Sequence, residues 1–309
     1  MPEAVIQVSD LVKTYGSLKA VDHISFQVFE GEVFAFLGPN GAGKTTTIEV
    51  LQTLRDPTSG SVRVLGHDIS VESEAAKVKR RMGVLPQDFN SLERLTVKEN
   101  LEFYASMYDR HREVGELMGL LDLERHAKVK FKELSGGLKQ RVGIAASLIN
   151  DPDIVFLDEP TTGLDPRSRR EVWEVIRRLR EAGKAVFLTS HYMEEAEELA
   201  DRIAIINRGR IAAIDSPHAL LENYGGNRTV LVEETTAELA VELTHRFAGA
   251  HYVGKELAIE VTSASQIGTI IEAASGMGRD GDITIRNPTI EDVFLRLIGS
   301  KIADGGELS

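Results

Sequence analysis

The chain has 309 residues, of which 42% are hydrophobic, and its 48 acidic and 36 basic side chains leave a net charge of -12. A chain of this length can bury a substantial core in about two domains, and its acidic balance argues against nucleic acid as the main partner. Because cysteine is absent, disulfides, thiolate nucleophiles and thiolate metal sites are excluded, which fits a reducing compartment.

The N-terminal stretch MPEAVIQVSD has neither the basic region nor the apolar region of a signal peptide. No apolar stretch approaches the roughly 18 residues that span a bilayer. We therefore expect a cytoplasmic chain without a membrane segment of its own.

Residues 1–222 alternate short apolar runs with segments of helical spacing, which is typical of an α/β domain with a largely parallel sheet. Four runs are almost continuously apolar, as in strands that helices cover on both faces. They are VFAFLG at 33–38, DIVFLDEP at 153–160, AVFLTSH at 185–191 and RIAIIN at 202–207. We expect these runs to form the centre of the sheet.

Residues 88–150 have helical spacing within this domain. Thr96 stands three residues before Glu99, which is the pattern of a capping box at a helix start. The region is therefore predicted to be a mostly helical insertion.

Past NYGGN at 223–227, whose paired glycines indicate a linker, the pattern changes. Residues 228–309 predict the order β-α-β-β-α-β with one added helix, which is the ferredoxin-like arrangement. The segments are TVLVE, TTAELAVELTHRFA, a short piece around Tyr252, ELAIEV, SASQIGTIIEAAS, DITIR and TIEDVFLRLIG, with the middle strands joined at Gly254–Lys255. A small C-terminal α+β domain is expected.

The segment GPNGAGKTT follows the first apolar run and precedes a helix, the context that the phosphate-loop pattern G-x-x-x-x-G-K-[ST] requires. Glycines let backbone N–H groups converge on phosphate oxygens at a helix N-terminus, where the helix dipole also favours negative charge. Lys44 is expected to reach the β- and γ-phosphates of ATP, Thr45 to bind Mg²⁺ and Thr46 to contact the α-phosphate side. The predicted nucleotide-binding residues are Gly38, Pro39, Asn40, Gly41, Ala42, Gly43, Lys44, Thr45 and Thr46. The alternative is a glycine-rich turn with an ordinary surface lysine.

The apolar run IVFLDEP ends in two carboxylates at the carboxyl edge of the predicted sheet. Asp158 is expected to hold Mg²⁺ or its bound water. Glu159 suits the general base that orients and deprotonates the attacking water, because phosphoryl transfer relies on positioning and charge stabilisation. The alternative is that these acids cap the following turn.

Two further polar residues follow strand-like runs and should emerge at the same edge. Gln87 ends GVLPQ and is expected to sense Mg²⁺ and the water. His191 ends AVFLTSH and is expected to donate to the γ-phosphate or to hold the water together with Glu159. Taken singly, either residue is equally explained as a solvated strand end.

The order of these motifs resembles that in ATP-binding subunits of ABC transporters, over about residues 4–220. The matching segments are the phosphate loop at 38–45, Gln87, LSGG at 134–137, LDEP at 157–160, LD at 164–165 and TSH at 189–191. The resemblance implies a P-loop NTPase fold of the ABC ATPase type with a helical subdomain.

In the family that the chain resembles, two copies pack head to tail. The resemblance implies that Ser135, Gly136 and Gly137 contact the γ-phosphate of ATP bound by the partner copy, and a helix N-terminus with a serine cap suits that role. A flexible helix cap is the alternative. The family usually has glutamine after SGG, so Leu138 puts the hydrolysis rate in doubt.

The resemblance also implies roles for two residues outside these motifs. Tyr15 matches the aromatic residue that stacks on adenine, although a lone tyrosine near a strand also fits a core position. Asp165 matches a residue that crosses the dimer interface, although it also fits an exposed turn acid before Pro166.

The segments SHYMEEAEELADRIAIINRGRI and EDVFLRLIG resemble the daunorubicin-resistance type of exporter ATPase, whose separate permease is of the ABC-2 kind. This implies an ATP-driven motor on the cytoplasmic face of the membrane, for drug, antibiotic or lipid-like efflux, with the permease contact around 88–130. The C-terminal domain would assist dimerisation or regulation. Its apolar stripe at 290, 293, 294, 297 and 298 equally fits packing within the domain.

Two other classes of function remain open. A soluble ABC-type ATPase acting on DNA or the ribosome is disfavoured by the acidic charge, by the single ATPase unit and by the absence of a long heptad run. A nucleotide-sensing module without turnover is suggested by Leu138 and opposed by Glu159.

Overall fold

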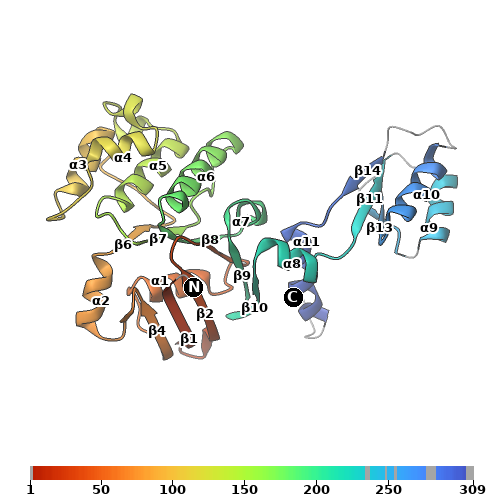
Figure 1. The fold of residues 1–309 in the computed structure, drawn as a ribbon, viewed down its shortest axis with the longest axis horizontal. Helices are drawn as coiled ribbons and strands as arrows, with labels where there is room; N and C mark the ends of the chain where they lie inside the picture. Colours follow the sequence, from red (N-terminus) through yellow and green to blue (C-terminus); the bar gives the residue numbers. More distant parts are fainter. Residues whose placement is uncertain (1–2, 234–236, 248, 254–255, 276–282, 304–309) are drawn as a thin grey trace. The chain divides into compact units, whose positions relative to one another are not determined.

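The computed structural model describes residues 3–233, 237–247, 249–253, 256–275 and 283–303. The chain divides into two compact units, Met1–Pro217 and His218–Ser309. Figure 1 shows the helices and strands of both units, coloured along the chain.

A six-stranded sheet forms the centre of the first unit, in the order β10-β9-β3-β8-β7-β6. Its strands are β3 (Val33–Leu37), β6 (Met82–Leu85), β7 (Ile154–Asp158), β8 (Ala185–Ser190), β9 (Arg202–Asn207) and β10 (Arg210–Asp215). All neighbours pair in parallel except β9 and β10. The four apolar runs are therefore adjacent strands, as predicted.

The central strands β9, β3, β8 and β7 are buried on both faces, which explains why they are almost continuously apolar. Successive residues of β7 alternate between two cores: Val155 and Leu157 pack with the helices, and Ile154 and Phe156 pack on the opposite side. That opposite side is an antiparallel sheet of order β2-β1-β4-β5, with helices α1 and α2 beside it (Figure 1). Its elements are β1 (Ala4–Tyr15), β2 (Leu18–Phe29), α1 (Lys44–Leu51), β4 (Ser59–Val64), β5 (His67–Asp68) and α2 (Glu72–Lys79).

The segment between β6 and β7 is mostly helical, as predicted. It contains α3 (Val97–Ala105), α4 (Val114–Leu120), two short 3-10 turns (Glu124–His126 and Phe131–Glu133) and α5 (Gly136–Ser147). The capping box at the start of α3 is confirmed, because Thr96 and Glu99 exchange side-chain to backbone hydrogen bonds of 3.2 and 2.8 Å. Helices α6 (Pro166–Glu181) and α7 (Met193–Leu199) follow β7 and β8.

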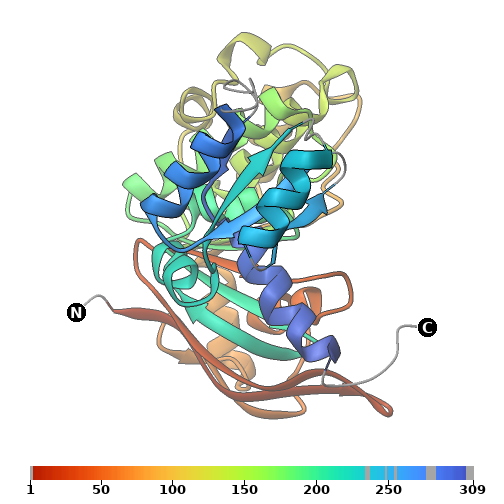
Figure 2. The same cartoon turned by 90° about the vertical axis from the view of Figure 1, so that its right-hand side faces the viewer.

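The second unit has a four-stranded antiparallel sheet of order β12-β13-β11-β14. Its elements are α8 (Pro217–Tyr224), β11 (Arg228–Val232), α9 (Ala237–Arg246), β12 (His251–Val253), β13 (Glu256–Val261), α10 (Ala264–Ser275), β14 (Ile283–Arg286) and α11 (Ile290–Ala303). Helices α9 and α10 lie side by side on one face of the sheet (Figure 2). This is the ferredoxin-like arrangement that the sequence predicts, and the expected junction at Gly254–Lys255 lies outside the described residues.

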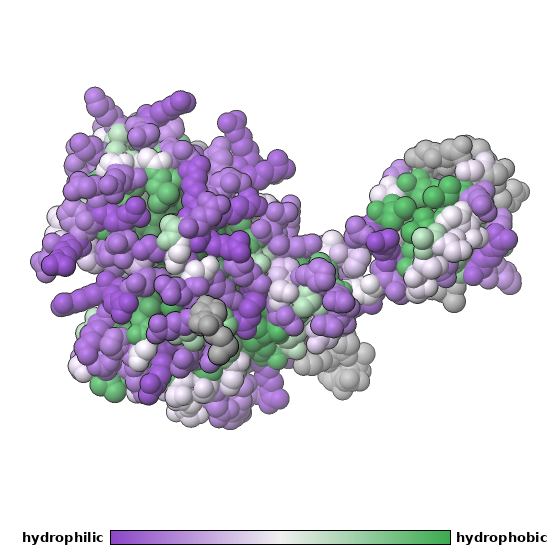
Figure 3. Space-filling model, in the orientation of Figure 1, coloured by the Kyte–Doolittle hydropathy of each residue, from purple (hydrophilic) through white to green (hydrophobic). Residues whose placement is uncertain are grey.

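Most of the predicted apolar stripe of α11 is buried. Ile290 and Val293 are fully buried, Phe294 is 9% exposed, and Leu297 and Ile298 are half-buried. Hydrophilic residues cover most of the visible surface of the first unit, whereas hydrophobic residues gather on the second (Figure 3). Among the described helices, none combines the length and the apolar character needed to cross a bilayer.

Candidate active site

A cavity of about 640 Å³ opens around the start of α1 in the first unit. It collects polar groups from strand ends and turns that are distant in sequence. The predicted site residues in its wall are Tyr15, Pro39, Asn40, Gly41, Gly43, Lys44, Thr45, Thr46, Gln87 and Glu159. Leu18, Lys19, Ala20, Arg208 and Gly209 complete the lining.

The loop between β3 and α1 requires glycine at two close approaches. Gly43 has a φ of 105°, and a Cβ there would lie 2.4 Å from the carbonyl oxygen of Ala20. A Cβ on Gly38 would lie 2.5 Å from the carbonyl oxygen of Ile206. Helix α1 then begins at Lys44 without a side-chain cap, so its first N–H groups can bind an anion.

Lys44 is a buried cation at the base of this cavity. Its side chain is 6% exposed, and its Nζ donates to the carbonyl oxygen of Gly38 at 2.8 Å and lies 3.6 Å from Glu159 Oε1. Burial lowers the pKa of Lys44, and the negative charge of Glu159 opposes the shift. Little water reaches this ammonium group. A bound phosphate group would therefore balance its positive charge.

Glu159 is the point where the predicted catalytic residues meet. Its Oε2 accepts hydrogen bonds from Gln87 Nε2 at 3.4 Å and from the Thr162 hydroxyl at 3.1 Å, and it lies 3.0 Å from His191 Nδ1. The residue has a φ of 48°, a left-handed conformation that costs a non-glycine residue of order 1–3 kcal/mol. Strain of this kind persists where the surrounding structure holds a functional group in place.

Asp158 offers carboxylate oxygens, Thr45 a hydroxyl oxygen and Gln87 an amide oxygen. Oxygen ligands of this kind are the ones that Mg²⁺ prefers. Asp158 accepts a hydrogen bond from the Thr189 hydroxyl, and burial raises the pKa of Asp158. Thr45 and Gln87 line the cavity next to it. No cluster of three or more His, Asp or Glu side chains suited to a metal exists within the part of the chain that the structure describes. The oxygen atoms of Asp158, Thr45 and Gln87 are of the kind that fits Mg²⁺.

Tyr15 lies at the cavity wall and is 40% exposed, so it is not a core residue. Two cations lie near its ring: Lys13 Nζ at 5.3 Å and the Arg55 guanidinium at 5.6 Å from the centroid. Neither cation lines the cavity. The ring is thus available to a flat apolar group inside the cavity.

Ser135, Gly136 and Gly137 do not line the cavity of their own chain. Ser135 caps α5, and its Oγ accepts from the backbone N–H of Leu138 at 3.4 Å. Ser135 and Gly136 are exposed, whereas a Cβ on Gly137 would lie 2.7 Å from the Cβ of Ser168 on α6. The unusual Leu138 packs its side chain against the helical core.

Asp165 likewise lies away from the cavity and caps α6. Its carboxylate accepts from the backbone N–H groups of Arg167 and Ser168, both at 3.0 Å. A hydrogen bond from the Ser168 hydroxyl and, to a smaller extent, one from the Ser168 backbone N–H lower the pKa of Asp165. Within one chain, these contacts match the interpretation of Asp165 as an exposed acid in the turn before Pro166.

The structure adds residues that motif reasoning missed. Thr162 bonds to Glu159, Thr189 bonds to Asp158, and Arg208 lines the cavity beside Gly209. Thr189 lies inside the TSH segment, so its position carried a signal. Arg208 stands in an ordinary turn after β9 and carried none.

Comparison with known proteins gives the same description over most of the chain. Residues 21–162 match the family model described as ABC transporter. A Nod factor export ATP-binding protein I of Burkholderia lata is 39% identical over 98% of this chain and 100% of its own length. A daunorubicin resistance ATP-binding protein of Streptomyces coeruleorubidus, DrrA3, is 37% identical over 97% of each chain.

Solved structures of two other proteins illustrate the shared fold. The dimeric bacterial ABC transporter cassette MJ0796 is 29% identical, with a TM-score of 0.61 over 68% of this chain and 98% of its own. The same cassette has been solved after hydrolysis with ADP and Pi bound. For CbiO1 of Clostridium perfringens the TM-score is 0.66 over 87% of this chain and 99% of its own, at 21% identity.

Proposed function

Because the chain belongs to the ATP-binding subunits of ABC transporters and is therefore an ATPase, we propose that it is the motor of an exporter. It drives transport through a separate membrane permease of the ABC-2 type. The observation that carries this proposal is the convergence of Lys44, Gln87 and His191 on Glu159 at the wall of one cavity.

The residues of this cavity suit hydrolysis of the γ-phosphate. The N–H groups at the start of α1 and the ammonium group of Lys44 bind the phosphates. Glu159 takes one proton from a water molecule whose oxygen bonds to the γ-phosphorus, while the bond to the bridging oxygen breaks and ADP leaves. His191 holds the γ-phosphate or the water. Gln87 positions the water from the end of the neighbouring strand β6. Thr45, Asp158 and Gln87 would hold Mg²⁺, which would neutralise negative charge on the phosphates when bound.

We assign Ser135, Gly136, Gly137 and Asp165 to the site of a second copy of this chain. Three of them are exposed or cap helix starts away from the cavity of their own chain. A dimer that packs head to tail places each SGG helix start opposite the phosphate loop of its partner, where its N–H groups bind the γ-phosphate. The related cassette MJ0796 is described as dimeric, which supports the assignment.

Export is proposed from the relatives, which are named for Nod factor export and daunorubicin resistance. We extend from these names to drug, antibiotic or lipid-like efflux, with the chain on the cytoplasmic face of the cell membrane. Large apolar side chains in the segment 88–130 are exposed and suit a permease contact. They are Leu92, Phe103, Met107 and Tyr108, at 44%, 42%, 59% and 40% exposed.

We divide the functions between residues 1–222, the ATPase with its helical insertion at 88–150, and residues 228–309, an accessory domain for dimerisation or regulation. The second unit has its own hydrophobic core between its sheet and α9 and α10, which supports an independent role.

Copurification tests the proposal. The chain is expressed at native level in its own cells, the membranes are solubilised gently, and the proteins retained in stoichiometric amount are identified. An integral membrane protein of about six spans is expected. Ribosomes, DNA or only non-membrane proteins would instead establish the second candidate, a soluble ABC-type ATPase, and refute the transport role.

A further inference from the structure

Glu195, on α7, is a fully buried carboxyl group that the proposed reaction does not use. Its Oε1 accepts hydrogen bonds from the Thr161 hydroxyl at 2.7 Å and from the Trp173 indole N–H at 3.1 Å. Its Oε2 is buried without a hydrogen bond to any residue that the structure describes. Burial of an incompletely paired carboxyl group costs free energy, so stability alone does not account for its presence.

Glu195 links the two segments that carry the catalytic groups, because its partner Thr161 follows Glu159 and its own helix α7 follows His191. Thr161 is fully buried, two residues after Glu159, and the next residue, Thr162, donates to the Glu159 carboxylate at 3.1 Å. Ser190 directly precedes His191. Burial raises the pKa of Glu195. Helix α7, which carries Glu195, begins at Met193, two residues after His191.

The loop of His191 is itself held by Ser190. The Ser190 Oγ accepts from the backbone N–H of Tyr192 at 2.9 Å and so spans His191. One carboxyl group thus links the helix that follows His191 to the loop after Glu159. A shift of either loop would separate two groups whose side chains now lie 3.0 Å apart.

We propose that Glu195 is a positioning residue that ties the loop of Glu159 to the loop of His191, so that both side chains reach the same phosphate. It acts through its hydrogen bond to Thr161 and through α7, and it does not line the nucleotide cavity. The inference rests on the proposed roles of Glu159 and His191.

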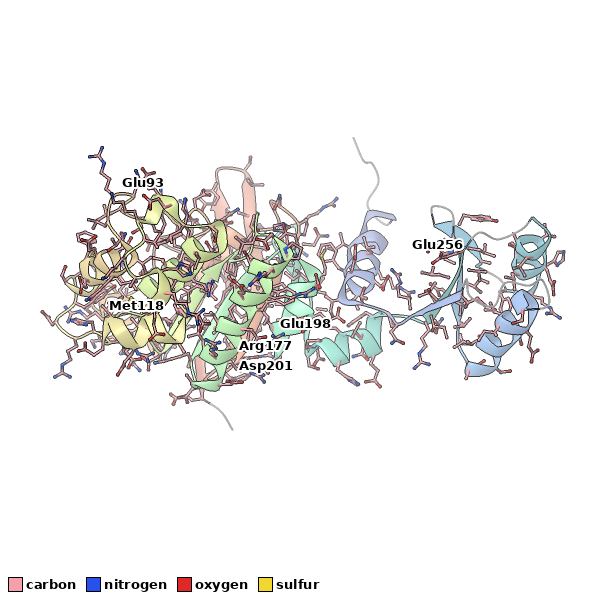
Figure 4. All side chains as sticks on the ribbon, turned by 90° about the horizontal axis from the view of Figure 1, so that it is seen from above. Glu93, Met118, Arg177, Glu198, Asp201 and Glu256 are labelled. Carbon is pink, nitrogen blue, oxygen red and sulfur yellow. The ribbon has the colours of Figure 1, made fainter. Side chains whose placement is uncertain are left out.

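Helix α7 has other attachments, so a change at Glu195 should leave the fold intact. Ala196 and Leu199 are buried. Arg177 on α6 donates to Glu198 on α7 at 3.0 Å, and Arg180 pairs with Asp201 just beyond α7. Figure 4 shows Arg177, Glu198 and Asp201 together where α6 meets this region.

The test compares ATP hydrolysis and ATP affinity of the full chain and three variants. Glu195→Ala should lower kcat about 10- to 100-fold, as expected when a catalytic group is displaced, and leave the Kd for ATP within about twofold. Glu195→Gln keeps an acceptor for both donors and should retain at least roughly half of the wild-type kcat. Thr161→Val, which removes only the hydroxyl, should lower kcat as Glu195→Ala does, and the double variant should lose little more.

Trp173→Phe is the matched control, because it removes the other donor to the same oxygen without touching either loop. Its kcat should stay within about twofold of the wild type. Wild-type kcat in Glu195→Ala, parallel losses of kcat and ATP affinity, or no rescue by Glu195→Gln would overturn the inference. If Glu195→Ala does not fold, Thr161→Val decides alone. Normal turnover in Glu159→Gln would instead overturn the proposed base, whatever the Glu195 variants show.

Discussion

At the scale of single residues, the site depends on how buried charges are arranged around Glu159. Its carboxylate is 9% exposed and contacts a lysine, a glutamine, a threonine and a histidine. A carboxylate with so many donors has a defined orientation, which a general base requires. The positive φ of the residue aims the side chain away from the direction that β7 alone would give it.

Glu159→Gln should remove the base and keep the shape of the site. We expect kcat to fall by about 10²- to 10⁴-fold, the usual contribution of general-base catalysis, with ATP still bound and the dimer trapped in its ATP-bound form. Phosphate release and size-exclusion chromatography with ATP measure both effects. Glu194→Gln is the control, because Glu194 is exposed and belongs to the same region; equal turnover in the two variants would exclude Glu159 as the base.

The buried Lys44 makes ATP binding sensitive to alkaline pH. Burial lowers the pKa of Lys44, and only the protonated ammonium group binds phosphate strongly. ATP affinity should therefore be constant near neutral pH and fall as pH rises through this lowered pKa, earlier than for an ordinary lysine. Calorimetric titration across this range measures the effect. Lys44→Arg stays charged and should remove the pH dependence, whereas an unchanged dependence in that variant would assign it to another group.

At the scale of elements, the strand ends bring the predicted catalytic groups together, and the helical insertion follows directly from one of them. Gln87 follows β6, and the chain after it returns to α3 through residues 91–96. Asn100, fully buried on α3, holds this return. Its Nδ2 donates to the carbonyl oxygens of Leu92, Leu95 and Thr96, and its Oδ1 accepts from Ser91.

Asn100→Ala should loosen the connection between the site and the insertion. It removes the acceptor of the Leu92 backbone N–H and one of the two donors to each of the three carbonyl groups, and we expect the free energy of unfolding to fall by about 2–3 kcal/mol. Urea denaturation measures this loss. Asn90→Ala is the matched control, since Asn90 is exposed on the same loop and should cost less than about 0.5 kcal/mol; a similar loss in both would contradict the bracing role of Asn100.

At the scale of the whole molecule, the two parts of the proposed composite site lie apart within one chain. The phosphate loop lines the cavity, whereas Ser135 caps α5 away from it. In the proposed head-to-tail dimer, each complete site would combine different surfaces of two copies.

Mixing two inactive variants tests this arrangement. Chains with Lys44→Ala lack a working phosphate loop, and chains with Ser135→Arg lack a working SGG helix start, so each homodimer should be inactive. A mixed dimer contains one site in which both parts are intact, and random assortment of subunits should restore about a quarter of the wild-type activity. Turnover is measured after the variants are mixed and allowed to exchange subunits. No recovery in confirmed mixed dimers would place both half-sites in the same chain.

Sequence alone was enough wherever the determining interactions are local. The phosphate loop needs glycine, lysine and threonine within a few residues between a strand and a helix, and a capping box needs Thr96 and Glu99 three positions apart. The sheet's centre followed from strands that are apolar on both faces, and the ferredoxin-like order of the second unit followed from alternating patterns. Each of these features is encoded within one segment.

Only the tertiary structure decided which polar groups meet. Gln87, Glu159 and His191 come from three strand ends, and their common contact depends on the order β8-β7-β6 in the sheet. Glu195 looks like one more acid in the run MEEAEEL, yet it is the buried one. Helical spacing predicts that some face of α7 is buried. Which side chain accepts hydrogen bonds from Thr161 and Trp173 is set by the packing of α6, α7 and the loop after β7. No local sequence pattern encodes that packing.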